Sequence, residues 1–199
     1  MTNLVASDPQ SKVGEFFSTI DASLAASGES GLEFIPEEIR ALSARIAELV
    51  CGLFREIEAP TLEQIQAVLF TVKDGLQLGG DPEAKQGHFV RLHKMPVAEE
   101  GQKQGLFVFV VIPKGHRAPK HWHLAGKTGL PGEVTVSLVN DLAWKESKEG
   151  EVLSTNANDP VRVSADVSMD DYQEQARTWV GFYAQFVPCT FQEPVALAA

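Results

Sequence analysis

Before residue 80, hydrophobic residues recur every three or four positions in three stretches, which predicts three amphipathic helices. The first should run from Pro9, which suits a first helical turn, to about Ala26, just before Gly28. The second should begin at 36–38, where a proline is followed by two acidic residues that the helix dipole favours. This helix is expected to end near 58–60.

The third helix should begin at Thr61, because Gln64 follows three residues later and completes a capping-box pattern. Its hydrophobic stripe extends to Leu76, and the Gly-Gly-Asp-Pro sequence at 79–82 is expected to stop it. After Gly87 the pattern changes, and β-branched and aromatic residues dominate. Strands are expected at 88–97, 105–113, 119–125, 133–146, 160–168, 177–186 and 190–197.

Two of these strands differ in their pattern. The strand at 105–113 is hydrophobic without alternation, so it should be buried on both faces. The strand that begins at Glu133 alternates, with Glu133, Thr135 and Ser137 on one face and hydrophobic residues on the other. A polar face inside a barrel is typical of a ligand cavity, so Glu133 should line it.

These patterns predict a mostly β fold with an N-terminal helical segment. At 199 residues the chain has the length of one domain. We expect residues 1–82 to pack as helices on a β-barrel or sandwich formed by residues 83–199, because the strand at 105–113 needs a cover on its outer face.

The composition of the chain argues against some classes of partner and location. The net charge of −10 disfavours nucleic acid and anionic membranes as partners, since both need clustered basic residues. No hydrophobic run reaches the length of a membrane span, and no signal peptide is visible, which indicates a cytoplasmic protein. Cys51 falls within a helical stripe and is expected in the core, whereas Cys189 follows Pro188 near the end of the chain; a bridge between them has no support in the sequence.

The candidate chemistry centres on two histidines. His121 and His123 are two residues apart in an expected strand, so both should point to the same face. A carboxylate on the next strand, Glu133, would complete a facial set of two histidines and one carboxylate, which suits a divalent metal with open positions.

The spacing of Gly115, His121, His123 and Glu133 resembles the first conserved motif of the cupin superfamily. This resemblance implies a cupin-like β-barrel, or double-stranded β-helix, in which the two histidines and the glutamate bind a metal. The metal would be iron first, with zinc, manganese or nickel as alternatives. It also implies a homodimer, since cupins are often dimers.

The segment at 113–123 is similar to cysteine-dioxygenase-like cupins, which also place helices before the barrel. The similarity implies that Arg91 binds the carboxylate of a substrate. Tyr183 is a candidate proton donor near the metal.

The sequence departs from the cupin pattern in two ways. Nine residues separate His123 from Glu133, where the family has three or four, and no histidine follows position 123 to provide the usual third imidazole. A substitute ligand could be His88, His93 or Gln185, or three ligands and water could suffice. His88 and His93 are five residues apart, so on a regular strand they would lie on opposite faces.

We therefore expect a metal-dependent enzyme that acts on a small, carboxylated organic substrate, with a non-heme iron dioxygenase as the leading class. Lyase or isomerase chemistry on the same scaffold is an alternative, because fold does not determine reaction. The missing third histidine favours another alternative, a non-catalytic protein that binds or senses a small molecule.

Overall fold

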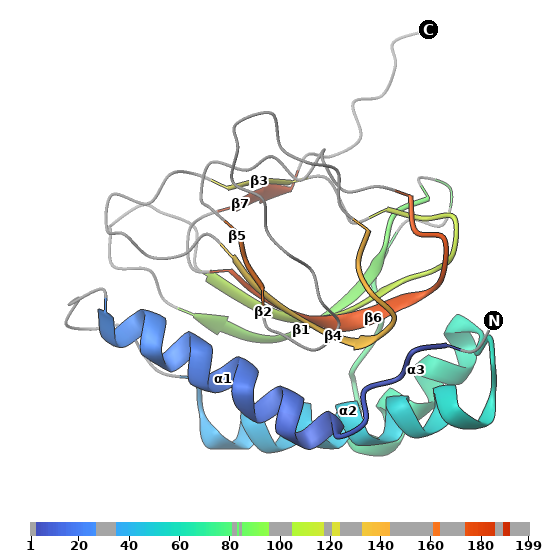
Figure 1. Cartoon of the computed structure of the whole chain (residues 1–199), viewed down its shortest axis with the longest axis horizontal. Helices are drawn as coiled ribbons and strands as arrows, with labels where there is room; N and C mark the ends of the chain where they lie inside the picture. The colour runs from blue at the N-terminus through green and yellow to red at the C-terminus, as the bar shows by residue number, and fades with distance from the viewer. Residues whose placement is uncertain are drawn as a thin grey trace, which may run out of the picture.

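The computed structural model describes residues 3–26, 35–80, 83, 85–95, 105–117, 121–123, 133–143, 161–163, 174–185 and 189–191. Three helices form one layer beneath a β-sheet, and a short β-ribbon lies on the opposite side of that sheet (Figure 1). The expectation of a helical segment packed on β-structure is confirmed. In the described residues helices and strands contribute comparable lengths, so the fold is mixed rather than mostly β.

The helices begin where the sequence indicates. They are α1 (Pro9–Ala26), α2 (Glu37–Glu56) and α3 (Leu62–Val72). At the start of α3 the Thr61 hydroxyl accepts a hydrogen bond from the Gln64 amide, and the Gln64 side chain accepts one from the Thr61 amide, which confirms the capping box. The helix ends at Val72, before the end of its hydrophobic stripe. Lys73 is already extended, and Leu76 is buried from outside the helix.

The larger sheet has five antiparallel strands in the order β1-β2-β6-β4-β5. They are β1 (His88–Met95), β2 (Gly105–Ile112), β6 (Trp179–Gln185), β4 (Glu133–Val139) and β5 (Val161–Val163). A separate ribbon pairs β3 (His121–His123) with β7 (Cys189–Phe191). Among the described strands the larger sheet has two edges, β1 and β5, and so is not closed into a barrel.

Asn140 ends β4, so the expectation of a strand over 133–146 is wrong for residues 140–143. Its φ of 57° is left-handed, a conformation that asparagine tolerates better than most residues. Its side chain accepts a hydrogen bond from the Leu4 amide and donates one to the Thr178 carbonyl. The chain therefore turns here, and the N-terminal segment is attached at the same point, where Val5 pairs with Val139.

The main core lies between the helices and the sheet. Alternate residues of the central strands face the helices and are buried there, including Phe107, Phe109, Val134, Val136 and Phe182. The other residues of β2 are buried on the opposite face, in a cluster with Trp179 and Tyr183. This confirms that the strand beginning at residue 105 is buried on both of its faces.

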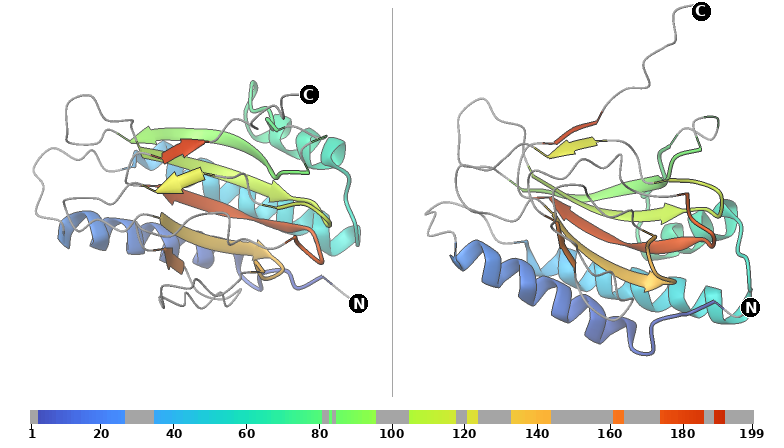
Figure 2. Two further views of the ribbon diagram at one scale, coloured as in Figure 1. Left: turned by 90° about the horizontal axis from the view of Figure 1, so that it is seen from above. Right: turned by 45° about the horizontal axis from the view of Figure 1, so that its top comes forward.

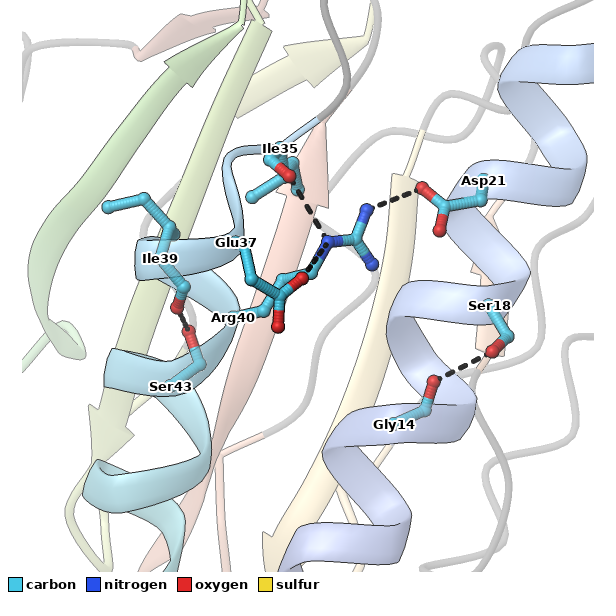
Figure 3. Close-up of polar contacts among 8 residues, drawn as sticks. All are labelled: Gly14, Ser18, Asp21, Ile35, Glu37, Ile39, Arg40 and Ser43. Atoms are coloured by element: carbon cyan, nitrogen blue, oxygen red, sulfur yellow. Dashed lines mark hydrogen bonds and ion pairs between the residues drawn. The ribbon is translucent and has the colours of Figure 1, made fainter.

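Arg40 of α2 joins the first two helices (Figure 3). Its guanidinium forms a 2.7 Å ion pair with Asp21 of α1, and its Nε donates a hydrogen bond to the Ile35 carbonyl. The same group lies 4.8 Å from the centre of the Phe17 ring, which adds a cation–π contact. The Arg40 side chain is only 20% exposed, so these contacts are partly shielded from water.

Cys51 is buried in the main core, as its helical spacing predicts, and it is a free thiol. Burial raises the pKa of this thiol to about 12, so it stays protonated and unreactive at neutral pH. The structure contains no helix, among those described, with the length and hydrophobicity needed to cross a membrane.

Candidate functional site

We call the face of the larger sheet that points away from the helices the distal face. It is defined by the register positions of Phe89 and Arg91 in β1, Leu106, Val108, Val110 and Ile112 in β2, Trp179, Gly181 and Tyr183 in β6, and Thr135 and Ser137 in β4. Thr135 and Ser137 share this face, as the alternation of β4 predicts, and both are buried. The β3–β7 ribbon lies on the same side of the sheet (Figures 1 and 2).

The two predicted catalytic residues lie in one row across this face. Arg91 is paired with Val108, Val108 with Tyr183, and Tyr183 with Thr135. Neighbouring strands are about 4.8 Å apart, so the Cα atoms of Arg91 and Tyr183 are about 10 Å apart, with Val108 between them. Arg91 is exposed and Tyr183 is buried. The face thus combines an accessible cation with a shielded phenol.

Trp179 and Tyr183 form an aromatic pair on the distal face. Their ring centres are 5.4 Å apart and the planes are nearly parallel. The Trp179 indole donates a 2.8 Å hydrogen bond to the Ser137 hydroxyl, which orients the ring. Gly181 lies between the two aromatic residues, and a Cβ there would be 2.4 Å from the indole. The absence of a side chain at this position allows the indole to lie over the strand.

Glu133, the predicted carboxylate ligand, occupies the first position of β4. Its register partners are Gln185 in β6 and Val163 in β5. Position 133 alternates in step with Thr135 and Ser137, so it lies on the same face of the sheet as they do. Position 185 lies on the same face as Tyr183 for the same reason. Strand register therefore puts Glu133, Tyr183 and Arg91 in positions of the distal face, although the side chain of Glu133 falls outside the described part.

His121 and His123 are the first and last residues of β3, two positions apart as the sequence analysis expects. The register of the ribbon sets Cys189 opposite His123 and Phe191 opposite His121. Directly opposed residues share a face of a β-ribbon, so Cys189 occupies a position next to the proposed ligands. Sequence patterns do not identify Cys189 as part of the site, because a pairing between such distant segments leaves no local signal. The side chains of the ribbon lie outside the description.

Two of the three candidates for a substitute ligand are not on the distal face. A β-bulge between Arg91 and His93 shifts the register, so His88 pairs with Val111 and His93 with Phe107, both of which face the helices. The expectation that these histidines lie on opposite faces is therefore wrong. The third candidate, Gln185, is the register neighbour of Glu133.

In the side chains that the structure describes, no three or more histidine, cysteine, aspartate or glutamate residues are grouped to hold a metal. The side chains of His121, His123 and Glu133 lie outside the described part, so these three remain predicted ligands. Imidazole, carboxylate and thiolate groups nevertheless form a donor set that suits iron, zinc or copper.

The sequence matches no model of a known protein family, and no curated protein matches it. The chemistry of the residues and the strand register are thus the grounds for assigning a function.

Proposed function

We propose that this protein is a metal-dependent cupin-type enzyme that acts on a small carboxylated organic molecule, with non-heme iron dioxygenase chemistry as the leading class. The observation that carries the proposal is the register of the larger sheet, which gives Arg91, Tyr183 and Glu133 positions on one face. The ribbon with His121 and His123 lies on the same side of that sheet.

In this proposal His121, His123 and Glu133 hold the metal, and Cys189 or Gln185 is the candidate for a further ligand. The metal, when bound, supplies a Lewis acid with open positions for substrate. Arg91 binds the substrate carboxylate through paired hydrogen bonds from its guanidinium. Tyr183 donates a proton from its phenol, and its stacking on Trp179 limits the directions in which the ring can move.

The apolar residues of β2 also have a role in the proposal. Val108 and its neighbours Leu106 and Val110 exclude water from the centre of the distal face. In a site with little water, the attraction between Arg91 and a carboxylate is stronger than in solvent. Substrate specificity would therefore come from a charged group at the β1 edge and an apolar centre.

The first test is metal content, by elemental analysis, of wild type and of a His121→Ala, His123→Ala double variant. Near-stoichiometric iron, or another first-row metal, in the wild type and its loss in the double variant are expected. Cys189→Ser and Glu133→Gln, measured in parallel, identify the remaining ligands. His93→Gln is the matched control, because it removes a histidine that faces the helices. A wild type that neither carries nor takes up metal would contradict the proposal and favour a non-catalytic small-molecule-binding protein.

The second test is oxygen uptake by the metal-loaded protein with small thiols and aromatic acids. For any substrate found, Arg91→Ala should raise KM by about 10-fold or more, because a charge-assisted hydrogen-bond pair is lost. Tyr183→Phe should lower kcat, because a proton donor contributes to the chemical step. Equal KM values for Arg91→Ala and wild type would show that Arg91 does not bind the substrate.

A further inference from the structure

A second pair of histidines lies away from the distal face, at the beginning of β1. His88 faces the helix side of the sheet and is only 6% exposed. The Nδ1 edge of its ring packs against Gly80, where an added Cβ would be 2.7 Å from Nδ1. Its Nε2 is buried and has no hydrogen-bond partner among the residues that the structure describes. A buried nitrogen of this kind is costly unless something binds it.

The neighbour of His88 is His116, in the loop that follows β2. The centres of the two imidazole rings are 6.4 Å apart. Nδ1 of His116 lies 3.2 Å from the Lys114 carbonyl oxygen. A carbonyl can only accept, so Nδ1 donates this hydrogen bond and Nε2 is the ring nitrogen left to bind a metal. Metal-binding histidines commonly have this arrangement, in which a backbone carbonyl fixes the tautomer.

Backbone hydrogen bonds hold the loop of His116 in place. The His116 carbonyl accepts a hydrogen bond from the Gln175 amide, and the Gln175 carbonyl accepts one from Gly115. The next residue, Arg117, exchanges hydrogen bonds with the segment just before β1, through Lys85 and Gly87. The backbone positions of the two histidines are therefore set by the fold and not by a free loop.

We propose that His88 and His116 form a binding site for a divalent transition metal such as Zn²⁺, with one nitrogen from each ring and exchangeable ligands in the other positions. A tetrahedral metal bonded at about 2.1 Å to both imidazoles holds the ring centres about 5 Å apart. The separation of 6.4 Å in this structure is about 1 Å longer, so metal binding requires the partly exposed His116 side chain to rotate toward His88. Imidazole nitrogens suit zinc, copper and nickel. Oε1 of Glu174 lies 3.7 Å from the Cβ position of Gly115, so a negative charge is close to this loop.

The protonation state of His88 agrees with metal binding. Burial, together with the nearby His116, lowers the pKa of His88 below its ordinary value. At neutral pH the ring is therefore uncharged, which is the form that binds a metal. This site is separate from the proposed catalytic centre, because His88 and Glu133 occupy opposite ends of the sheet.

The test is a Zn²⁺ titration of the full-length, chelator-treated protein, in which calorimetry measures the binding. A His121→Ala, His123→Ala background removes the proposed catalytic metal, so the two sites are measured independently. This background should still bind one Zn²⁺ ion. Adding His116→Ala should weaken that binding by about 10-fold to 100-fold or more. Loss of an outer-shell partner alone has an effect of this size, and His116 is proposed to bind the metal directly. Adding His93→Gln, in the same strand as His88, should leave it unchanged.

Ring nitrogen signals of histidine, recorded by NMR, provide a second readout. Zn²⁺ should shift the signals that disappear in His88→Gln and His116→Ala. Should His88→Gln fail to fold, His116→Ala decides the question, because its side chain is partly exposed in a loop. A background protein that binds no Zn²⁺, or that binds it equally well without His116, would overturn the proposal. Neither result would affect the catalytic proposal, whose ligands are already absent from that background.

Discussion

His88 shows how one buried side chain links the stability of this protein to pH. The pKa of His88 is lowered from its ordinary value of 6.5, first by burial and then by the nearby His116. The unfolded chain therefore takes up a proton at a pH where the folded chain does not. By linkage, the free energy of unfolding must fall as pH decreases from about 6.5 toward the folded-state pKa.

His88→Gln should remove this part of the pH dependence, because glutamine does not titrate. Urea denaturation at pH values above and below about 6.5, in chelator, measures the free energy of unfolding of both proteins. Wild type should lose more stability on acidification than the variant. An equal loss in the two proteins would show that His88 accepts a proton in the folded state as readily as in the unfolded state.

A single residue also explains why His88 and His93 lie on the same face of β1 and not, as expected, on opposite faces. Counting by twos along a strand is valid only while the strand is regular, and the bulge at Leu92 inserts one extra residue. Nothing in the local sequence, with its histidines, arginine and leucine, marks this position. The sequence therefore predicts the strand, but not the face on which its second half presents each residue.

Two arginines of α2 allow the effect of burial on an ion pair to be compared within one helix. Arg40 is partly buried and contacts Asp21, the Ile35 carbonyl and the Phe17 ring. Arg45 forms a 2.8 Å ion pair with Glu48, but both side chains are about half exposed. The N–O distances of the two pairs are similar, so the difference in burial should determine how much each pair contributes to the free energy of unfolding.

Arg40→Ala should destabilise the protein by about 1 to 2 kcal/mol, because it removes a charge-assisted contact between α1 and α2. Arg45→Ala should cost about 0 to 0.5 kcal/mol, as is usual for an exposed pair within one helix. Chemical denaturation of both variants measures these values. The Arg40 contacts would be unimportant if the two variants lost equal stability.

At the scale of elements, the sequence predicts much of the fold. The starts of the helices follow from caps and from hydrophobic periodicity, and Thr61 with Gln64 is an example in which every predicted contact forms. The ends are harder to predict, because Leu76 belongs to the predicted hydrophobic stripe of α3 but lies after the helix and is buried in the main core from there. Similarly, Asn140 ends β4 through contacts with Leu4 and Thr178, which are distant in sequence.

The whole molecule should unfold as one unit. The helices and the sheet share one continuous core, in which Phe16 and Phe17 of α1 contact Phe107 of β2. Neither layer can separate without exposing these rings to water, at a cost of about 5 to 9 kcal/mol, which is comparable with the stability of a typical domain.

Thermal or urea unfolding should therefore give the same midpoint by circular dichroism, which follows the helices, and by fluorescence of Trp179, which follows the sheet. Trp122→Phe and Trp144→Phe leave Trp179 as the only indole of the protein. Two separate midpoints would instead indicate that residues 1–82 and 83–199 form independent domains.

The candidate site is predictable from the sequence only in part. The spacing of His121 and His123 predicts a shared face, and the alternation of β4 predicts that Thr135 and Ser137 lie on one face of the sheet. The relation of Arg91 to Tyr183 depends on β2 lying between β1 and β6, and the neighbour of His123 depends on the pairing of β7. Both facts concern which strands pair, and local patterns do not encode this choice.

The contact between Trp179 and Gly181 has a consequence for how this sequence can change over evolutionary time. A side chain at position 181 would meet both the indole and the Val136 carbonyl, and the latter belongs to the backbone of β4. Replacing Trp179 with a smaller residue relieves only the first of these clashes. Position 181 is therefore closed to substitution whatever occupies 179, whereas 179 can vary. We therefore expect variants that keep this fold to retain glycine at 181 even where a smaller residue replaces Trp179.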